Sequence, residues 1–120
     1  MKNILITGGA GFIGYFLANR LCKKYKVDLI DNFSRGKKDY EFQKLIKNKN
    51  INFYKKDLLK KINLKKQYSY IFHLAAIVGV KNVTDHPEKV LTNNLILLKN
   101  MIDFAKKQQL LKKFFSFPQA

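Results

Sequence analysis

The sequence predicts an α/β protein built on a doubly wound parallel sheet. Three observations predict it: a short apolar run stops at a glycine-rich turn, helical patterns alternate with further apolar runs, and two of those runs follow each other directly in mid-chain. Right-handed crossovers between such strands give the order 3-2-1-4-5. The chain has 120 residues, so we expect one domain over 1–120 with room for a modest core.

The first half of the chain alternates strands and helices. Apolar β-type runs predict strands over 2–7, 26–31 and 51–56. Apolar spacing near 3.6 predicts a helix over 12–24, and a weaker pattern predicts one over 39–48. The apolar positions of the first helix are Phe12, Ile13, Phe16, Leu17 and Leu21.

The second half repeats the alternation with a longer helix. The run YIFHLAA predicts a strand over 70–76, and KKFFSF predicts a fifth strand over 112–117. Between them we expect a helix over 87–108, because Pro87 suits a first helical turn and an apolar stripe follows it. That stripe consists of Leu91, Leu95, Leu98, Ile102 and Ala105.

A sheet of this order places its ligand crevice at the carboxyl ends of strands 1 and 4, where the strand order reverses. Residues 7–14 and 75–80 both fall there. The convergence of these two segments argues for a binding site more strongly than either segment alone.

Residues 7–14, TGGAGFIG, hold four of the chain's six glycines. Gly8, Gly11 and Gly14 fit G-x-x-G-x-x-G, while Gly9 with the last two fits G-x-G-x-x-G. Either set follows a strand and opens a helix, so backbone can approach a pyrophosphate that the helix N-terminus attracts. We therefore predict nucleotide binding, with a plain glycine-rich turn as the alternative.

Asp31 ends the second strand, where a carboxylate accepts hydrogen bonds from adenosine ribose hydroxyls and repels a 2′-phosphate. This favours NAD over NADP, although an arginine such as Arg35 can hold a 2′-phosphate. Asp57 and Leu58 follow the third strand, beside the expected adenine position. A turn or helix-capping role for Asp57 is an equal alternative.

Several residues that invite a catalytic interpretation have simpler ones. We expect His73 to be packed and hydrogen-bonded, His86 to lie at the surface, and Cys22 to be buried and inert, with no metal site. Tyr40 and Lys44 match the Y-x-x-x-K spacing of short-chain dehydrogenases. They follow strand 2, on the adenosine side of the crevice, so we expect no catalytic role for them.

The composition limits the function classes. No segment has the roughly 20 apolar residues of a membrane span or the form of a signal peptide, and a single cysteine fits a reducing compartment, so we expect a cytoplasmic protein. The net charge of +16 suggests a polyanion partner. However, the lysines are spread along the chain and arginines are scarce, so we expect no nucleic-acid binding.

Taken together, these residues resemble the NAD-dependent epimerase/dehydratase family, the extended short-chain dehydrogenases, and within it the nucleotide-sugar epimerases and dehydratases. Five landmarks carry the resemblance along nearly the whole chain: TGGAGFIG at 7–14, DNFSRGK at 31–37, DL at 57–58, HLAA at 73–76, and P-x6-N from Pro87 to Asn94. The family's T-G-x-x-G-x-x-G selects Gly8, Gly11 and Gly14. Gly9 then becomes a small residue within the loop.

The resemblance implies a Rossmann domain that binds NAD. Phe12 and Ile13 would offer backbone N–H groups to the pyrophosphate, and Asp31 and Asn32 would hold the adenosine ribose. The other implied contacts are Asp57 and Leu58 beside adenine, and Leu74, Ala75 and Ala76 along the cofactor. Asn94 matches the family's helix asparagine, with an ordinary polar position beside the apolar stripe as the alternative.

The sequence departs from the family at its end. Where the family has F-x-x-S-S, the run FFSFPQA puts Pro118 and Gln119 at the serine positions, and Ser116 comes two residues early. The family's Tyr-x-x-x-Lys would follow beyond Ala120. We therefore expect a member truncated after strand 5, with no catalytic residue of its own and without the catalytic segment and substrate domain.

The resemblance also implies a reaction. In this family NAD takes a hydride from a hydroxyl carbon of a nucleotide-linked sugar, and epimerisation or dehydration follows. A nucleotide sugar would be a substrate here only if a C-terminal part is supplied. Exposed Phe114, Phe115 and Phe117 on an edge strand favour self-association or pairing with such a fragment. The alternatives are a nucleotide-sensing or partner-binding module without chemistry, and a polyanion binder.

Overall fold

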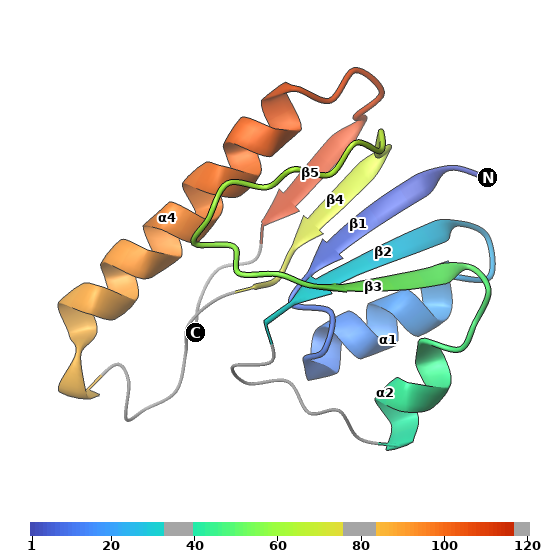
Figure 1. Cartoon of the computed structure of the whole chain (residues 1–120), viewed down its shortest axis with the longest axis horizontal. Coiled ribbons are helices and arrows are strands. Elements are labelled where there is room, and N and C mark those ends of the chain that lie inside the picture. Colours follow the sequence, from blue (N-terminus) through green and yellow to red (C-terminus); the bar gives the residue numbers. More distant parts are fainter. Residues whose placement is uncertain (33–39, 76–83, 117–120) are drawn as a thin grey trace.

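The computed structural model describes residues 1–32, 40–75 and 84–116. Within them, five strands form one parallel sheet in the order β3-β2-β1-β4-β5 (Figure 1). All the strand arrows point to the same edge of the sheet, so the carboxyl ends of the strands lie together there. The predicted doubly wound sheet and its strand order are confirmed.

Each predicted strand and helix is present, with shorter bounds in most cases. The strands are β1 (Asn3–Thr7), β2 (Lys26–Asp31), β3 (Ile51–Lys55), β4 (Tyr70–His73) and β5 (Lys113–Ser116). The helices are α1 (Phe12–Leu21), α2 (Tyr40–Leu45) and α4 (Pro87–Lys106). β1 is central, so Ile6 pairs with Leu29 of β2 on one side and with Phe72 of β4 on the other.

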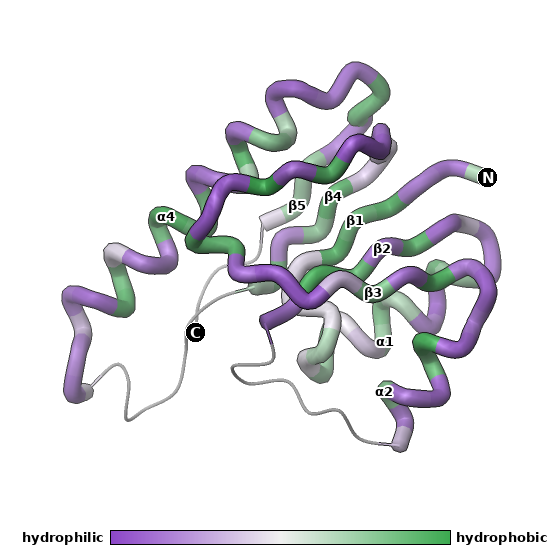
Figure 2. The backbone as a smooth tube through the Cα atoms, in the orientation of Figure 1, coloured by the Kyte–Doolittle hydropathy of each residue, from purple (hydrophilic) through white to green (hydrophobic). Residues whose placement is uncertain are grey.

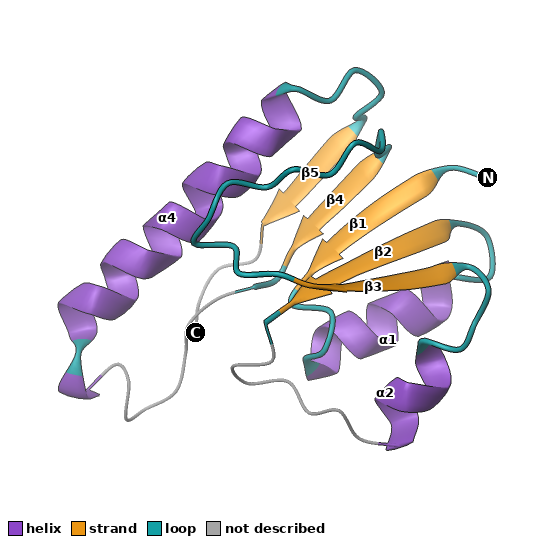
Figure 3. Cartoon of the chain, in the orientation of Figure 1, coloured by secondary structure: helices purple, strands orange, loops and turns teal. Residues whose placement is uncertain are grey.

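Both faces of the sheet are covered (Figure 3). Ile4 and Ile6 of β1 contribute to a core under α1 and α2, whereas Leu5 contributes to a second core under α4 and residues 56–69. Alternate residues of one strand therefore enter opposite cores, which is why β1 is a continuous apolar run rather than an alternating one.

Helix α1 packs with its small residues, not with the large ones expected. Gly14 and Ala18 are its buried residues. Phe12, Ile13 and Phe16 are 78%, 60% and 53% exposed. The predicted apolar face was therefore wrong for these three side chains, although the predicted Leu17 and Leu21 do pack against the core. The reason is close approach: α1 lies so near the glycine loop that only small residues fit between them.

Helix α4 also buries a different face from the one expected. Leu97, Met101 and Phe104 are buried, whereas Leu91 and Leu95 of the predicted stripe are 63% and 58% exposed. Hydrophobic and hydrophilic positions are interleaved along this helix (Figure 2). Both sets have helical spacing, so apolar periodicity by itself does not choose between them.

Residues 56–69, here called the strap, join β3 to β4 without forming a helix. The strap runs along one face of the sheet and buries Leu58, Ile62 and Tyr68 in the core beneath α4. The sequence predicts no element there. Its apolar residues are buried by contacts with the sheet and α4. A local sequence pattern does not reveal such long-range contacts.

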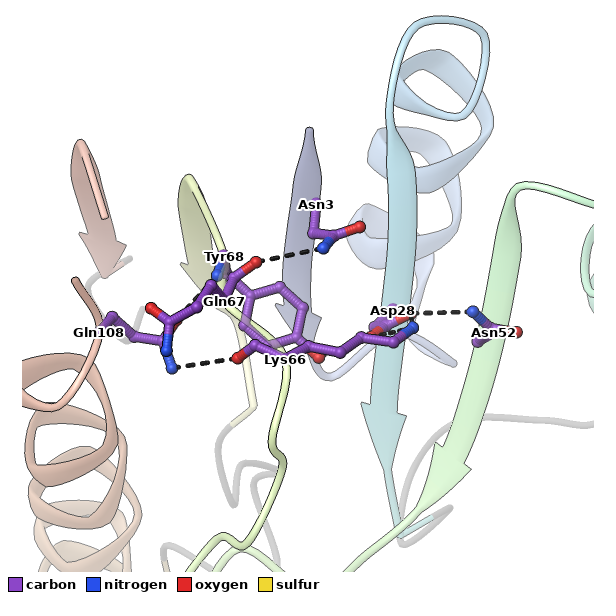
Figure 4. A network of polar contacts seen from close by, with 7 residues as sticks. All are labelled: Asn3, Asp28, Asn52, Lys66, Gln67, Tyr68 and Gln108. Carbon is purple, nitrogen blue, oxygen red and sulfur yellow. Dashed lines mark hydrogen bonds and ion pairs between the residues drawn. The ribbon is translucent and has the colours of Figure 1, made fainter. Parts of the chain in front are cut away.

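A buried polar network fastens the strap to the sheet (Figure 4). The carboxylate of Asp28, 1% exposed in β2, accepts hydrogen bonds from the Tyr68 hydroxyl at 2.5 Å and the Asn52 amide at 3.2 Å, and pairs with Lys66 Nζ at 3.2 Å. Burial, together with the hydrogen bond to Asp28, raises the pKa of Tyr68 well above its ordinary value, so the phenol stays protonated and donates. The network continues through Asn3 Nδ2 to Gln67 O at 3.2 Å, Tyr68 N to Gln108 Oε1 at 2.7 Å, and Gln108 Nε2 to Lys66 O at 3.4 Å.

The predicted exposure of phenylalanines on the edge strand β5 is confirmed in part. Phe115 of β5 is 36% exposed and Phe114 is half-buried, while Phe117 lies outside the described residues. No helix in the described part of the chain combines the length and hydropathy that a membrane span requires.

Candidate functional site

The candidate site lies at the carboxyl ends of β1 and β4, where the chain leaves β1 through the glycine loop. Gly8 has φ +74°, a conformation that residues with a side chain rarely adopt. A Cβ at Gly8 would lie 2.9 Å from the backbone nitrogen of Ala75. The loop therefore passes directly against the backbone that follows β4, and only glycine permits that contact.

The same loop also lies against β2 and α1. The Gly8 and Gly9 amides donate to the Ile30 carbonyl at 2.8 and 3.2 Å. A Cβ at Gly9 would lie 2.7 Å from Leu29 Cβ, and one at Gly14 would lie 2.5 Å from the Gly8 carbonyl oxygen. Thus Gly8, Gly9 and Gly14 leave no room for a side chain. Gly11, with a Cβ position 3.3 Å from its nearest neighbour, is less constrained.

The start of α1 is open towards an anion. Gly11 is its N-cap residue, with no side-chain hydrogen bond to the helix, and the first turn carries no acidic residue. The first N–H groups of a helix have no partner within the helix, and the helix dipole is positive there. Phe12 and Ile13 direct their side chains outward, so it is the backbone of this turn that is offered to a ligand.

Asp31 braces the glycine loop from the end of β2. One of its oxygens, Oδ2, accepts a hydrogen bond from the Ala10 amide at 2.9 Å, and the residue is 9% exposed. The sequence predicts Asp31 as a ribose ligand but not as a support for the loop. A carboxylate has several acceptor positions, so both roles are chemically compatible.

Thr7 and His73 lie side by side at the carboxyl ends of β1 and β4, next to the glycine loop. Thr7 Oγ1 lies 2.8 Å from His73 Nδ1 and accepts from the Leu74 and Ala75 amides, both at 3.1 Å. Burial lowers the pKa of His73 to about 4, so its ring is neutral near pH 7. The prediction of a packed, hydrogen-bonded His73 is confirmed.

The structure describes three more of the predicted cofactor contacts: Asn32, Leu74 and Ala75. Leu74 and Ala75 adjoin Gly8 through their backbone, and Asn32 is exposed at the end of β2. Ala76 lies outside the described residues. The predicted roles of these residues stay predictions.

Asp57 and Leu58 both make contacts within the fold. Asp57 Oδ1 accepts a hydrogen bond from the Leu59 amide at 3.0 Å, which is the turn role given as the alternative. Leu58 is buried in the core, and its carbonyl accepts from Asn100 Nδ2 at 2.8 Å. Contact with adenine would therefore involve the backbone here or the Asp57 carboxylate, not the Leu58 side chain.

Thr7 and Gly9 also contribute to the site, and the sequence does not predict their roles. Thr7 was given no role of its own, although a hydroxyl as the last residue of an otherwise apolar central strand is a signal. Gly9 was assigned only as a small residue, because its restriction comes from Leu29 in another strand. Spacing within the loop does not reveal that contact.

Other reactive residues lie away from this crevice or are inert. Cys22 is a buried free thiol, and His86 is exposed before α4. Tyr40 and Lys44 are both exposed on α2. Across residues 1–32, 40–75 and 84–116, no three histidine, cysteine or acidic side chains come together as metal ligands would.

Comparison with known proteins identifies the family. The family model for the NAD dependent epimerase/dehydratase family matches residues 4–117. The chain belongs to this family. A family member from Bacillus cytotoxicus, a UDP-N-acetyl-alpha-D-glucosaminuronate decarboxylase, is 36% identical over 110 residues, which is 88% of this chain and 33% of the relative.

Solved structures of epimerases share the fold. An epimerase from Methanothermobacter thermautotrophicus superposes with a TM-score of 0.80 and 31% identity, over 96% of this chain and 34% of that one. A UDP-glucuronic acid 4-epimerase variant from Bacillus cereus, in complex with NAD and a fluorinated UDP-sugar, gives a TM-score of 0.77 and 31% identity, over 95% of this chain and 39% of that one. The chain therefore spans about a third of the length of these relatives.

Proposed function

We propose that residues 1–120 are the NAD-binding part of a nucleotide-sugar epimerase or dehydratase, and that the protein is cytoplasmic. The observation that carries the proposal is the glycine loop, which joins β1 to α1 while lying against the backbone after β4. This arrangement brings an uncapped helix N-terminus to the point where the strand order reverses. It is the arrangement that a pyrophosphate requires.

Each part of the crevice has a role in this proposal. The backbone N–H groups of Phe12 and Ile13 would bind the pyrophosphate, with Gly8, Gly11 and Gly14 allowing its approach. Asp31, with Asn32 beside it, would accept the ribose hydroxyls. The remaining proposed contacts are Asp57 and Leu58 near adenine, and Leu74, Ala75 and Ala76 along the cofactor.

NAD supplies the hydride acceptor and donor for a reaction at a sugar hydroxyl carbon. The chain's own contribution is to hold and orient the dinucleotide. Tyr40 and Lys44, which have the Y-x-x-x-K spacing, are both exposed on α2, the helix that follows β2. We therefore assign no catalytic residue within residues 1–120, and a nucleotide sugar would be turned over only together with a C-terminal part.

A calorimetric titration of the purified 120-residue chain with NAD tests the proposal. We expect saturable binding of NAD and no turnover of a panel of UDP- and dTDP-sugars. Addition of the C-terminal two-thirds of a homologous epimerase is expected to produce turnover if the parts complement each other.

Two outcomes would overturn the proposal in different ways. Absence of NAD binding would remove the cofactor role. Hydride transfer by the isolated chain would show that the catalytic groups lie within it. Binding of NAD without any turnover, even with the added fragment, would favour the nucleotide-sensing alternative.

A further inference from the structure

The hydroxyl of Thr7 has a defined set of hydrogen bonds. Its oxygen accepts the Ala75 amide at 3.1 Å and the Leu74 amide at 3.1 Å; the Leu74 amide is shared with the Thr7 carbonyl at the same distance. A hydroxyl oxygen has two acceptor positions and one proton to donate. With both acceptor positions used, the proton is directed to His73 Nδ1, which lies 2.8 Å away.

This assignment fixes the state of the imidazole. A ring nitrogen that accepts a hydrogen bond from the Thr7 hydroxyl carries no proton of its own, so His73 is neutral and its single proton lies on Nε2. Its surroundings favour the neutral form: the ring is buried, 6% exposed, and stacks on Phe114 with centroids 6.3 Å apart.

The groups that Thr7 holds are those that border the crevice. Leu74 and Ala75 have left the β4 ladder, and their backbone is the surface that Gly8 touches. Across this junction of β1 and β4, the Thr7 hydroxyl accepts from the Leu74 and Ala75 amides and donates to the His73 ring.

We propose that Thr7 and the Nε2-protonated form of His73 are a pair of positioning residues, which hold the Leu74–Ala75 backbone against the glycine loop so that the crevice is shaped before the dinucleotide binds. The proposal rests on the NAD-binding function proposed above. The pair does not touch reacting atoms; it acts through the backbone that it holds.

The tautomer of His73 provides a test that needs no cofactor. Two-dimensional ¹⁵N–¹H spectra of the histidine rings in the intact chain, near neutral pH, should show His73 with a bare Nδ1 and a protonated Nε2. The exposed His86 is the internal reference for a solvent-averaged ring. A His73 ring protonated on Nδ1 would overturn the proposal, because Thr7 would then have no acceptor for its proton.

Three variants test the effect on binding. Thr7→Val keeps the shape of the side chain and removes the hydroxyl, whereas Thr7→Ser keeps the hydroxyl. Thr92→Val, on the exposed surface of α4, is the matched control. We expect Thr7→Val to weaken NAD binding about tenfold, to speed hydrogen exchange at the Ala75 amide, and to disturb the His73 tautomer. Thr7→Ser should restore all three readouts, and Thr92→Val should change none of them.

The outcomes separate this proposal from the proposed function. If the unmutated chain has the expected tautomer but binds no NAD, the proposed function fails and the positioning role fails with it. The hydrogen bonds that join Thr7 to His73, Leu74 and Ala75 would still stand. If the chain binds NAD and Thr7→Val binds it equally well, the positioning role alone fails. If Thr7→Val does not fold, Thr7→Ser and the tautomer of the unmutated chain still decide the matter.

Discussion

The buried polar network around Asp28 and the one around Thr7 lie at different levels of the same sheet. The network around Asp28 is centred near the middle of the strands, where Asp28 pairs with Leu5. The network around Thr7 lies at the carboxyl ends, where Thr7 pairs with His73. The first contains an ion pair with Lys66, whereas the second is neutral.

The two networks hold different kinds of partner. Asp28 binds side chains, and three of them arrive from other segments: Asn52, Lys66 and Tyr68. It thereby fixes a strap that has no secondary structure of its own. Thr7 instead binds backbone amides after β4 and so shapes a crevice. Partial burial disfavours the charge on Lys66, but the hydrogen bond to Asp28 and the negative charge of Asp28, with smaller contributions from Tyr54, together raise the pKa of Lys66.

The kind of partner that a buried polar residue holds, side chain or backbone, indicates whether it supports the fold or the candidate site. Removing one partner from a buried ionic network is strongly destabilising, because the remaining groups stay buried without their hydrogen bonds. A neutral hydroxyl between two strand ends contributes less to stability but sets the position of backbone that a ligand meets. The following predictions separate these two contributions.

The largest expected effect is at Asp28. Asp28→Ala leaves the Tyr68 hydroxyl and the Lys66 ammonium without their acceptor, although water partly solvates Lys66, whose side chain is 41% exposed. We expect the free energy of unfolding, measured by urea denaturation at pH 7, to fall by about 3 kcal/mol. NAD affinity of the folded variant should stay unchanged.

Asp103→Ala is the matched control for Asp28. It removes an exposed ion pair with Lys99, at 3.0 Å within α4, and should leave the urea midpoint unchanged within error. If the two aspartate variants are equally stable, the strap does not depend on the buried network.

Stability should also depend on pH through His73. Its pKa is about 4 in the folded chain and about 6.5 when unfolded, so between these values the unfolded chain binds the extra proton. This contribution to stability is complete above about pH 6.5 and is lost as the pH falls towards 4, on the order of 3 kcal/mol in all.

Urea denaturation from pH 4 to pH 7 measures this dependence. The decrease should disappear in His73→Gln and remain in His86→Gln, since His86 is exposed. A His73→Gln variant with an unchanged pH profile would assign the dependence to other groups.

Substitutions in the glycine loop should act mainly on binding. Gly8→Ala places a Cβ 2.9 Å from the Ala75 nitrogen at φ +74°. We expect a loss of about 1 to 3 kcal/mol in stability and loss of NAD binding at millimolar concentrations. In Gly11→Ala, where the nearest atom is 3.3 Å away, the loss of affinity should be clearly smaller. Equal effects at both positions would mean that contact with β4 does not control binding.

Among the residues of the candidate site, Asp31 has the smallest expected effect on the fold. Asp31→Ala removes one hydrogen bond to Ala10, worth about 1 kcal/mol, and the charge that repels a 2′-phosphate. Competition titrations should show the preference for NAD shifting towards NADP. If the unmutated chain already prefers NADP, Asp31 does not set cofactor choice.

Much of this architecture is determined by the sequence alone. Apolar β-type runs predict the strands, and right-handed crossovers predict the strand order, because both depend on local chemistry and chain handedness. The glycine loop and Asp31 were placed at one crevice for the same reason. The family landmarks lie within these locally readable segments.

Only the tertiary structure decided which faces are buried and which polar residues meet. Phe12 and Leu91 fit an apolar helical face in sequence yet lie exposed, because α1 turns Gly14 against the glycine loop and α4 buries Leu97 instead. The bond from Thr7 to His73 joins residues 66 positions apart. Such partners are chosen by the approach of strands and helices to one another, and local periodicity contains no information about that distance.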